Sequence, residues 1–287
     1  MSKIKDQLEI NKEWSEKELE ASEPKYEYKD EQGEHMHLYN NKPLLGTSTV
    51  VGVLAKPLTW WASGLACEKF GWINAKKRVD GKYTTIPEKT RLEAILPQLE
   101  AIKKETPEQF LKRCDEAYKA HSVKLDTSAQ EGTDLHAECE RFVKNKMAGI
   151  DGLYDPKINP LIDWCEQNVE EYLYSEANCY STRLWVGGIS DFGAKLKDGR
   201  YVVIDFKSSK EAYMSQFIQG GGYAIQIEEN HILNSKGKVQ KIVDWKFDGV
   251  IIFPFGADKV EPQAKWNMEE LKQGFESCVT LYKLTNN

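Results

Sequence analysis

The chain has 287 residues, of which 40% are hydrophobic and 29% are charged, and its formal net charge is -6 at pH 7. This charged fraction excludes an integral membrane protein, and the length allows one large domain or two small ones. There is no run of 18 apolar residues and no signal-peptide core near the N-terminus. We therefore expect a soluble, cytoplasmic protein without a membrane partner.

The cysteines and the basic residues narrow the class further. Six cysteines occur without a CxxC pair, which predicts free thiols in a reducing compartment and argues against a zinc ribbon. The net negative charge argues mildly against a nucleic-acid-binding protein, but affinity for phosphate depends on where Lys and Arg lie. Basic runs occur at 76–78, 103–104 and 112–113, and each of them could instead be a solvated surface.

The predicted elements begin after a polar N-terminal segment. Residues 1–34 are highly charged and poor in aliphatic side chains, which predicts a flexible or weakly helical arm. Residues 35–54 predict a strand, a turn at Asn40 and Asn41, and then a β-branched strand or the start of a helix.

A helical block is predicted over residues 55–122. Its helices are expected at 58–72, 87–104 and 107–122. The last two have proline near their starts, where the missing N–H costs nothing, and Pro97 should kink the second.

Helices and strands are mixed in the second half of the chain. A helix capped by Asp126 is expected next, because its apolar residues recur at i, i+4, i+7 and i+8 from Leu135. Further helices are expected at 159–176, 211–229 and 266–284, and strands at 179–188, 189–196, 201–207 and 245–255. This order predicts an α/β or α+β fold with a helical insert before its core.

Charged residues interrupt two of the predicted strands. Val203, Asp205 and Lys207 alternate along one strand, so their side chains share a face. A salt bridge at a strand end would explain Asp205 with Lys207, but it would not explain Asp191 in the preceding strand. Buried carboxylates need partners or a bound cation.

Two helical segments carry further candidates. His136 and Glu140 are four residues apart and share a helix face, where histidine is more often structural and glutamate more often solvated. The glycines at 220–222 should cost about 2–3 kcal/mol relative to alanine, so another element or a ligand must pack against that helix. Gln219 and Tyr223 are one turn apart and share the same face.

Together these segments resemble the PD-(D/E)XK nuclease superfamily. Within it they are most similar to the RecB-type exonucleases, which include phage members and the mitochondrial genome maintenance exonuclease. The matching segments, in the order and spacing of the family, are GTDLHAECE (132–140), GGISD (187–191), IDFK (204–207) and QGGGY (219–223). The resemblance spans about residues 125–255 and is weaker at 35–72.

The resemblance implies a restriction-endonuclease-like fold, with a central mixed β-sheet flanked by helices. It implies one nuclease domain over residues 35–287, after the N-terminal arm. Within that domain the helical block would lie over the site, residues 125–255 would form the core, and residues 264–287 would form a closing helix.

The resemblance also implies a metal site. His136, Asp191, Asp205 and the backbone carbonyl of Phe206 would bind Mg²⁺ or Mn²⁺. Carboxylates suit magnesium, and one imidazole makes manganese suitable too. Lys207 would position or help to deprotonate the attacking water and would offset phosphate charge.

Other residues would support this site. Gln219 and Tyr223 would brace the site or the DNA backbone, and Glu140 and Glu176 are less certain supporting candidates. The glycines between Gln219 and Tyr223 depart from the family pattern, which has bulkier residues there. Tyr223 could therefore stack on a base or only pack.

The helical block is expected to line or roof the DNA channel. Its contacts to phosphate would come from Lys76, Lys77 and Arg78, with Ser208 as a further DNA-binding candidate outside the block. Trp60, Trp61 and Trp72 could offer a stacking surface to unpaired bases, or they could simply be core residues.

The implied function is that of a metal-dependent DNA exonuclease in phage-type recombination, replication or repair. Its partners would be single-stranded DNA or duplex ends, and a phage single-strand annealing or binding protein. A structure-selective endonuclease and a non-catalytic nucleic-acid-binding module remain as alternatives. Iron–sulfur relatives, including the CRISPR adaptation nuclease, carry three cysteines near the C-terminus. This chain has Cys278 alone there, so we expect no iron–sulfur cluster.

The implied metal site requires Asp191 and Asp205 to lie on the same face of the hairpin that joins them. A two-residue turn at Asp198 and Gly199 would set Asp191 opposite Phe206, on the other face from Asp205. A one-residue shift moves every side chain to the other face. We therefore predict a three-residue loop with Gly199 in the left-handed region, or a bulge in either strand.

Overall fold

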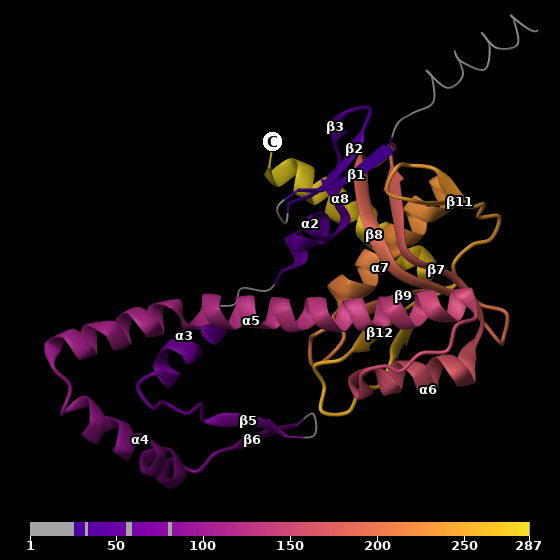
Figure 1. Cartoon of the computed structure of the whole chain (residues 1–287). Coiled ribbons are helices and arrows are strands. Elements are labelled where there is room, and N and C mark those ends of the chain that lie inside the picture. Colours follow the sequence, from indigo (N-terminus) through magenta and orange to yellow (C-terminus); the bar gives the residue numbers. More distant parts are fainter. Residues whose placement is uncertain (1–25, 32–33, 56–58, 80–81, 287) are drawn as a thin grey trace, which may run out of the picture. The chain divides into compact units, whose positions relative to one another are not determined.

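A computed structural model describes residues 26–31, 34–55, 59–79 and 82–286 (Figure 1). The chain divides into two compact units, which are described separately below. The first contains residues 1–54 and 135–287, and the second contains residues 55–134. The second unit begins at the residue where the predicted helical block begins.

The first unit is built on a large mixed sheet. Its strands are β4 (Leu45–Gly46), β7 (Val169–Ser181), β8 (Val186–Leu196), β9 (Tyr201–Lys207), β10 (Ile232–Leu233), β11 (Val239–Lys241), β12 (Gly249–Pro254) and β13 (Gln263–Lys265). They are ordered β11-β10-β7-β8-β9-β12-β13, and β4 pairs with β8. β12 runs parallel to β9, whereas β7, β8 and β9 are antiparallel neighbours.

Helices cover both faces of this sheet, which confirms the predicted mixed sheet flanked by helices (Figure 1). Val203 and Val250 pack on one face with residues of α7 (Met214–Asn230) and α8 (Met268–Thr285). Ile204 packs on the other face, with Phe142 of α5 (Pro107–Ala148) and Leu161 of α6 (Asn159–Asn168). A short 3₁₀ helix, η2 (Pro156–Ile158), precedes α6.

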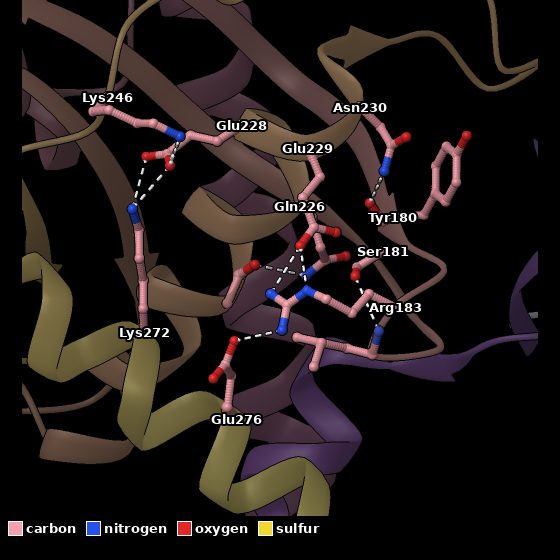
Figure 2. A network of polar contacts seen from close by, with 12 residues as sticks. Tyr180, Ser181, Arg183, Gln226, Glu228, Glu229, Asn230, Lys246, Lys272 and Glu276 are labelled. Atoms are coloured by element: carbon pink, nitrogen blue, oxygen red, sulfur yellow. Dashed lines mark hydrogen bonds and ion pairs between the residues drawn. The ribbon is translucent and has the colours of Figure 1, made fainter.

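Ion pairs fix the C-terminal half of α7 to its neighbours (Figure 2). Glu228 is almost fully buried and accepts hydrogen bonds from Lys272 of α8 at 2.9 and 3.0 Å. Arg183, in the turn between β7 and β8, donates to Glu229 at 2.9 Å and to Glu276 at 2.7 Å. A buried charge is tolerated only when it is paired in this way, so Lys272 compensates Glu228 and ties α7 to α8. The Arg183 pairs are more exposed and contribute less.

The helix predicted to start after Asp126 is not separate from the one at 107–122. The structure has a single helix, α5, of 42 residues. The prediction of a cap at Asp126 is therefore wrong. The physical reason is that residues 122–125 contain neither glycine nor proline, so nothing ends the first helix.

The predicted helix at 159–176 ends at Asn168, and its second half belongs to β7. Val169, Tyr172 and Tyr174 favour a strand, and pairing with β8 decides between the two conformations. The predicted strand at 179–188 is likewise divided, because β7 ends at Ser181 and β8 begins only at Val186.

A hairpin occupies part of the segment predicted as a flexible arm. β1 (Tyr26–Glu31) pairs with β2 (Glu34–Tyr39), and β2 pairs in turn with β3 (Lys42–Pro43). The prediction of an arm is therefore wrong for residues 26–31 and for Glu34, and residues 1–25 and 32–33 lie outside the described part of the chain. The predicted turn is confirmed, with φ of +49° at Asn40 and +60° at Asn41.

Two alternatives were predicted for the end of residues 35–54, a β-branched strand and the start of a helix, and the structure has the helix. The chain continues from β4 into α2 (Thr47–Val51) and the 3₁₀ helix η1 (Gly52–Leu54). Val50 of α2 is fully buried and packs with residues of α8.

The second unit is helical with one hairpin. It contains α3 (Thr59–Glu68), α4 (Glu88–Ile102, with Pro97 inside) and the first part of α5, together with the unpredicted hairpin of β5 (Lys76–Val79) and β6 (Lys82–Thr85). Among the side chains of this unit that the structure describes, only Ala117 is buried.

Among the residues that the structure describes, no single helix combines the length and the apolar content needed to cross a bilayer. The pair Thr47–Leu54 and Thr59–Glu68 meets the criterion together, by length and composition only.

Candidate active site

The hairpin between β8 and β9 has the three-residue loop that was predicted from the hypothesis of a metal site. Lys195 pairs with Tyr201, and the Leu196 N–H donates to the Arg200 carbonyl at 2.8 Å. The loop is therefore 197–199, and Gly199 has a φ of +92° in the left-handed region. Continuing this register sets Asp191 opposite Asp205, so the pairing permits the two carboxylates to share one site.

The strands separate at Asp191. Pairing of β8 with β9 stops at Phe192, and the Asp191 Oδ2 atom accepts a hydrogen bond from the Phe206 N–H at 2.9 Å. The Phe255 N–H donates to the Lys207 carbonyl, so odd-numbered residues of β9 bond to β12. Phe206 therefore turns both its N–H and its carbonyl toward β8, the side on which Asp191 lies.

Glu176 lies in the neighbouring strand at the same level. The β7–β8 pairing runs from Ser175 with Phe192 to Ala177 with Ser190, and Glu176 between them has a φ of +52°. A left-handed conformation is uncommon for glutamate, and such strain concentrates at functional sites. Burial, followed by the charges of Asp191 and Glu140, raises the pKa of Glu176 to about 8.

Asp205 is buried, with 1% of its surface exposed. The Lys207 Nζ atom lies 2.6 Å from Asp205 Oδ2, but neither Asp205 oxygen accepts a well-aligned hydrogen bond from a described residue. Burial raises the pKa of Asp205, and the Asp191 charge adds to that rise while Lys207 opposes it. Burial lowers the pKa of Lys207, but Asp205 and Asp191 outweigh it and raise that pKa above its usual value.

The helix α5 brings His136 and Glu140 to this group. The His136 Nδ1 atom lies 3.7 Å from Asp191 Oδ2, and the His136 ring meets the Phe206 ring edge-on at 5.9 Å. Glu140, one turn further along, forms an ion pair with Lys144. His136 is therefore held beside a sequence-predicted carboxylate, and Glu140 is near enough to affect Glu176.

The residues of α7 pack instead of facing an open surface. The Gln219 Nε2 atom donates to the Tyr223 hydroxyl at 2.9 Å, and both side chains are buried. The Asp205 and Asp191 charges add to burial in raising the pKa of Tyr223, which places its hydroxyl near the carboxylates. Of the two predicted roles, bracing the site fits this geometry, and stacking on a base does not.

The three glycines of α7 are explained by packing against other elements. A Cβ on Gly220 would lie 2.4 Å from Val250 of β12, and one on Gly222 would lie 2.5 Å from the Phe275 ring. A Cβ on Gly221 would lie 2.7 Å from the backbone of Leu271 in α8. Glycine lowers the stability of a helix, but α7 needs glycine here because the sheet and α8 lie too close for a larger side chain.

The predicted DNA-binding residues are divided between the two units. Lys76, Lys77 and Arg78 belong to β5 of the second unit, and the side chains of the last two lie outside the described residues. Ser208 is exposed directly after β9 in the first unit. Trp60 is 90% exposed and Trp61 is 38% exposed, so these two tryptophans are not core residues.

The donor set of the first unit fits a divalent cation. The charges of Asp191, Glu140 and Asp205 all act on Glu176, and Asp205 offers two buried oxygens without aligned hydrogen bonds. Asp191, Asp205, His136 and the Phe206 carbonyl would hold Mg²⁺ or Mn²⁺. Within the described residues no three His, Cys, Asp or Glu side chains already form a coordination set, so the ligands would have to move together on binding.

No protein-family model matches the chain, and neither does any curated protein sequence. The likeness to the PD-(D/E)XK superfamily therefore stays a prediction based on four short segments. Sequence reasoning missed the β1–β2 hairpin, which packs beside this group of residues. The alternation of aromatic residues at 26 and 28 and at 35, 37 and 39 could have predicted it.

Proposed function

We propose that this protein is a divalent-metal-dependent DNA exonuclease that hydrolyses phosphodiester bonds. The observation that carries the proposal is the buried Asp205 carboxylate, which has one ammonium partner, no aligned hydrogen bond and two acidic neighbours, Asp191 and Glu176. Such an arrangement is costly unless a cation compensates it. Mg²⁺ or Mn²⁺ bound by Asp191, Asp205 and His136 would supply that compensation.

Each residue then has a task that its surroundings support. The bound metal would neutralise phosphate charge and lower the pKa of a water. The charges of Asp205 and Asp191 outweigh burial and raise the pKa of Lys207. Lys207 would position or help to deprotonate the attacking water and would offset phosphate charge. Gln219 and Tyr223, which are hydrogen-bonded to each other, would brace the site.

The setting of this activity follows from the same resemblance. The enzyme would act on single-stranded DNA or duplex ends in phage-type recombination, replication or repair. Its place would be the cytoplasm, that of the bacterial host if a phage encodes it. A phage single-strand annealing or binding protein would supply or protect its substrate.

The test uses end-labelled DNA, single- and double-stranded, linear and circular, with Mg²⁺ or Mn²⁺. We expect linear molecules to shorten from an end, circles to resist, and a chelator to stop the reaction. Cleavage of circles would favour the structure-selective endonuclease. Binding without hydrolysis under every condition would leave only the non-catalytic module.

A metal titration separates the metal site from the reaction. His136→Ala should weaken Mn²⁺ binding on the order of tenfold and shift the preference toward Mg²⁺, because imidazole favours the softer ion. His121→Ala, on the same helix but in the second unit, is the matched control and should bind both ions like the wild type. If the two variants bind both ions equally well, His136 does not bind the metal and its role is structural.

A further inference from the structure

Five aromatic rings form a continuous column on the β1–β2 hairpin. Tyr180 of β7 stacks on Tyr26, with ring centroids 5.0 Å apart and planes at 11°. Tyr26 then meets His37 at 6.0 Å, and His37 meets Tyr28 at 5.1 Å. The last ring is that of His35, which stacks on Tyr28 at 6.1 Å with planes at 12°.

The column runs from the core to the solvent. Tyr26 is 2% exposed and His37 is 8% exposed, whereas the His35 side chain is 63% exposed. Its outer rings are nevertheless held in place. The Tyr28 hydroxyl and His35 Nδ1 share a hydrogen bond of 2.6 Å, and the Tyr28 N–H donates to the Ser235 carbonyl at 2.9 Å. An exposed ring that is fixed in this way presents a preorganised flat surface.

The column stands beside the carboxylate site. The Tyr26 hydroxyl reaches Asn178 at 3.3 Å, two residues from Glu176 in β7. His37 packs closely on Gly187 of β8, because a Cβ added to Gly187 would lie only 2.7 Å from the Cβ atom of His37. Glu176 is near enough to Tyr28 that its charge, after burial and Asp30, raises the pKa of the Tyr28 hydroxyl.

The charges around His35 decide which part of a nucleic acid fits. Asp30 Oδ2 lies 3.7 Å from His35 Nδ1. The Asp30 carboxylate repels phosphate, so the open end of the column suits an uncharged, flat group. Unstacked bases of single strands stack on aromatic side chains, histidine included.

We propose that His35 is the stacking platform for a terminal nucleobase of the substrate strand. This inference rests on the proposed function and deepens it, because it assigns the aromatic column the task of holding the strand end beside the carboxylates. His35 is then a positioning residue for the substrate. Its stacking surface accepts any base, and therefore predicts binding without strong sequence preference.

The test measures binding of single-stranded oligonucleotides to the full chain carrying Asp205→Asn, so that the DNA is not consumed. One pair of probes carries fluorescent 2-aminopurine at the 5′ or the 3′ end, and a second pair is abasic at the same positions. His35→Ala should weaken binding of one 2-aminopurine probe roughly five- to a hundredfold and should relieve its quenching. His35→Phe should retain both properties, because it keeps a ring.

Two comparisons distinguish stacking from a structural effect. Met36→Ala, on the opposite face of the same strand, should bind like the Asp205→Asn parent. With the abasic probes, His35→Ala and the parent should bind alike. A loss that persists with abasic probes, or a His35→Ala variant that binds every probe like the parent, would overturn this inference. If the wild-type chain and the parent bind no DNA at all, the proposed function fails together with it.

Discussion

The two units of the chain differ in what they bury and in the charge they carry. The first has helices on both faces of a sheet, with fully buried residues such as Phe142 and Ile204. The second buries only Ala117 among its described side chains and exposes Trp60 almost completely. Residues 55–134 contain 14 Lys and Arg against 12 Asp and Glu, a net +2, so the rest of the chain carries -8.

A metal-dependent nuclease would need two things, a support for its metal ligands and a surface that attracts DNA, and the two units differ in both respects. Carboxylates that hold a metal need a rigid, well-packed support, and the first unit provides it. A polyanionic strand is attracted by positive charge and by exposed aromatic rings, and these are concentrated in the second unit. Variants in each unit test whether the first unit supports the metal ligands and the second unit attracts the strand.

The largest effect should follow from removing the central pair of the first unit. Asp205→Ala or Lys207→Ala should reduce hydrolysis by ~10³-fold or more, because each removes a group that acts on the metal or the water. The fold should survive Lys207→Ala, since the Asp205 carboxyl, whose pKa is already raised, can take up a proton. Lys195→Ala, in β8 outside the site, is the control. Near-normal turnover by a folded Asp205→Ala or Lys207→Ala variant would remove the catalytic assignment.

Truncation of one large apolar residue in each unit tests the difference in packing. Phe142→Ala should cost about 3–5 kcal/mol of unfolding free energy, because the ring is fully buried. Leu96→Ala in α4, where the side chain is 56% exposed, should stay within about 0.5 kcal/mol. Both values come from denaturant unfolding followed by circular dichroism. Equal costs would mean that Leu96 is covered in solution.

A matched pair of helix glycines gives a smaller effect of opposite sign. Gly221→Ala in α7 should destabilise by about 1–3 kcal/mol, because the new Cβ would lie 2.7 Å from the Leu271 backbone. Gly64→Ala in α3 should stabilise by up to about 1 kcal/mol, since its Cβ would meet only the Trp72 ring at an ordinary 3.6 Å. Thermal unfolding of both variants checks the signs. A stabilising Gly221→Ala would show that α8 can move away.

The features of the fold that were predicted correctly are those set by local pattern and geometry. Periodicity predicted α7 and α8 to within a few residues, and the asparagine pair predicted the turn at 40–41. Parity predicted the odd-length hairpin once Asp191 and Asp205 were assigned to one metal site, since any even arrangement places them on opposite faces. The candidate site came from four short segments. The structure brings His136 within 3.7 Å of Asp191 and Lys207 within 2.6 Å of Asp205.

The features that were missed depend on contacts between distant parts of the sequence. Residues 169–176 suit a helix or a strand, and pairing with β8 decides for the strand. The glycines of α7 pointed equally to a ligand or to a neighbour, and only the position of α8 resolves this. Residues 26–31 look like part of a charged arm until Tyr180 and Gly187 supply the surface on which the hairpin packs.

The smallest effect concerns the second unit and its positive charge. Reversing Lys76, Lys77 and Arg78 to glutamate should weaken DNA binding and flatten its salt dependence. Each lost phosphate contact removes close to one counterion from the slope of log K against log salt. Binding would be measured over a salt series with the Asp205→Asn chain, and reversal of the exposed Lys157, Lys236 and Lys238 in the first unit controls for total charge. If the three reversals leave both affinity and slope unchanged, these residues do not lie along the DNA, and the positive charge of the second unit serves another purpose.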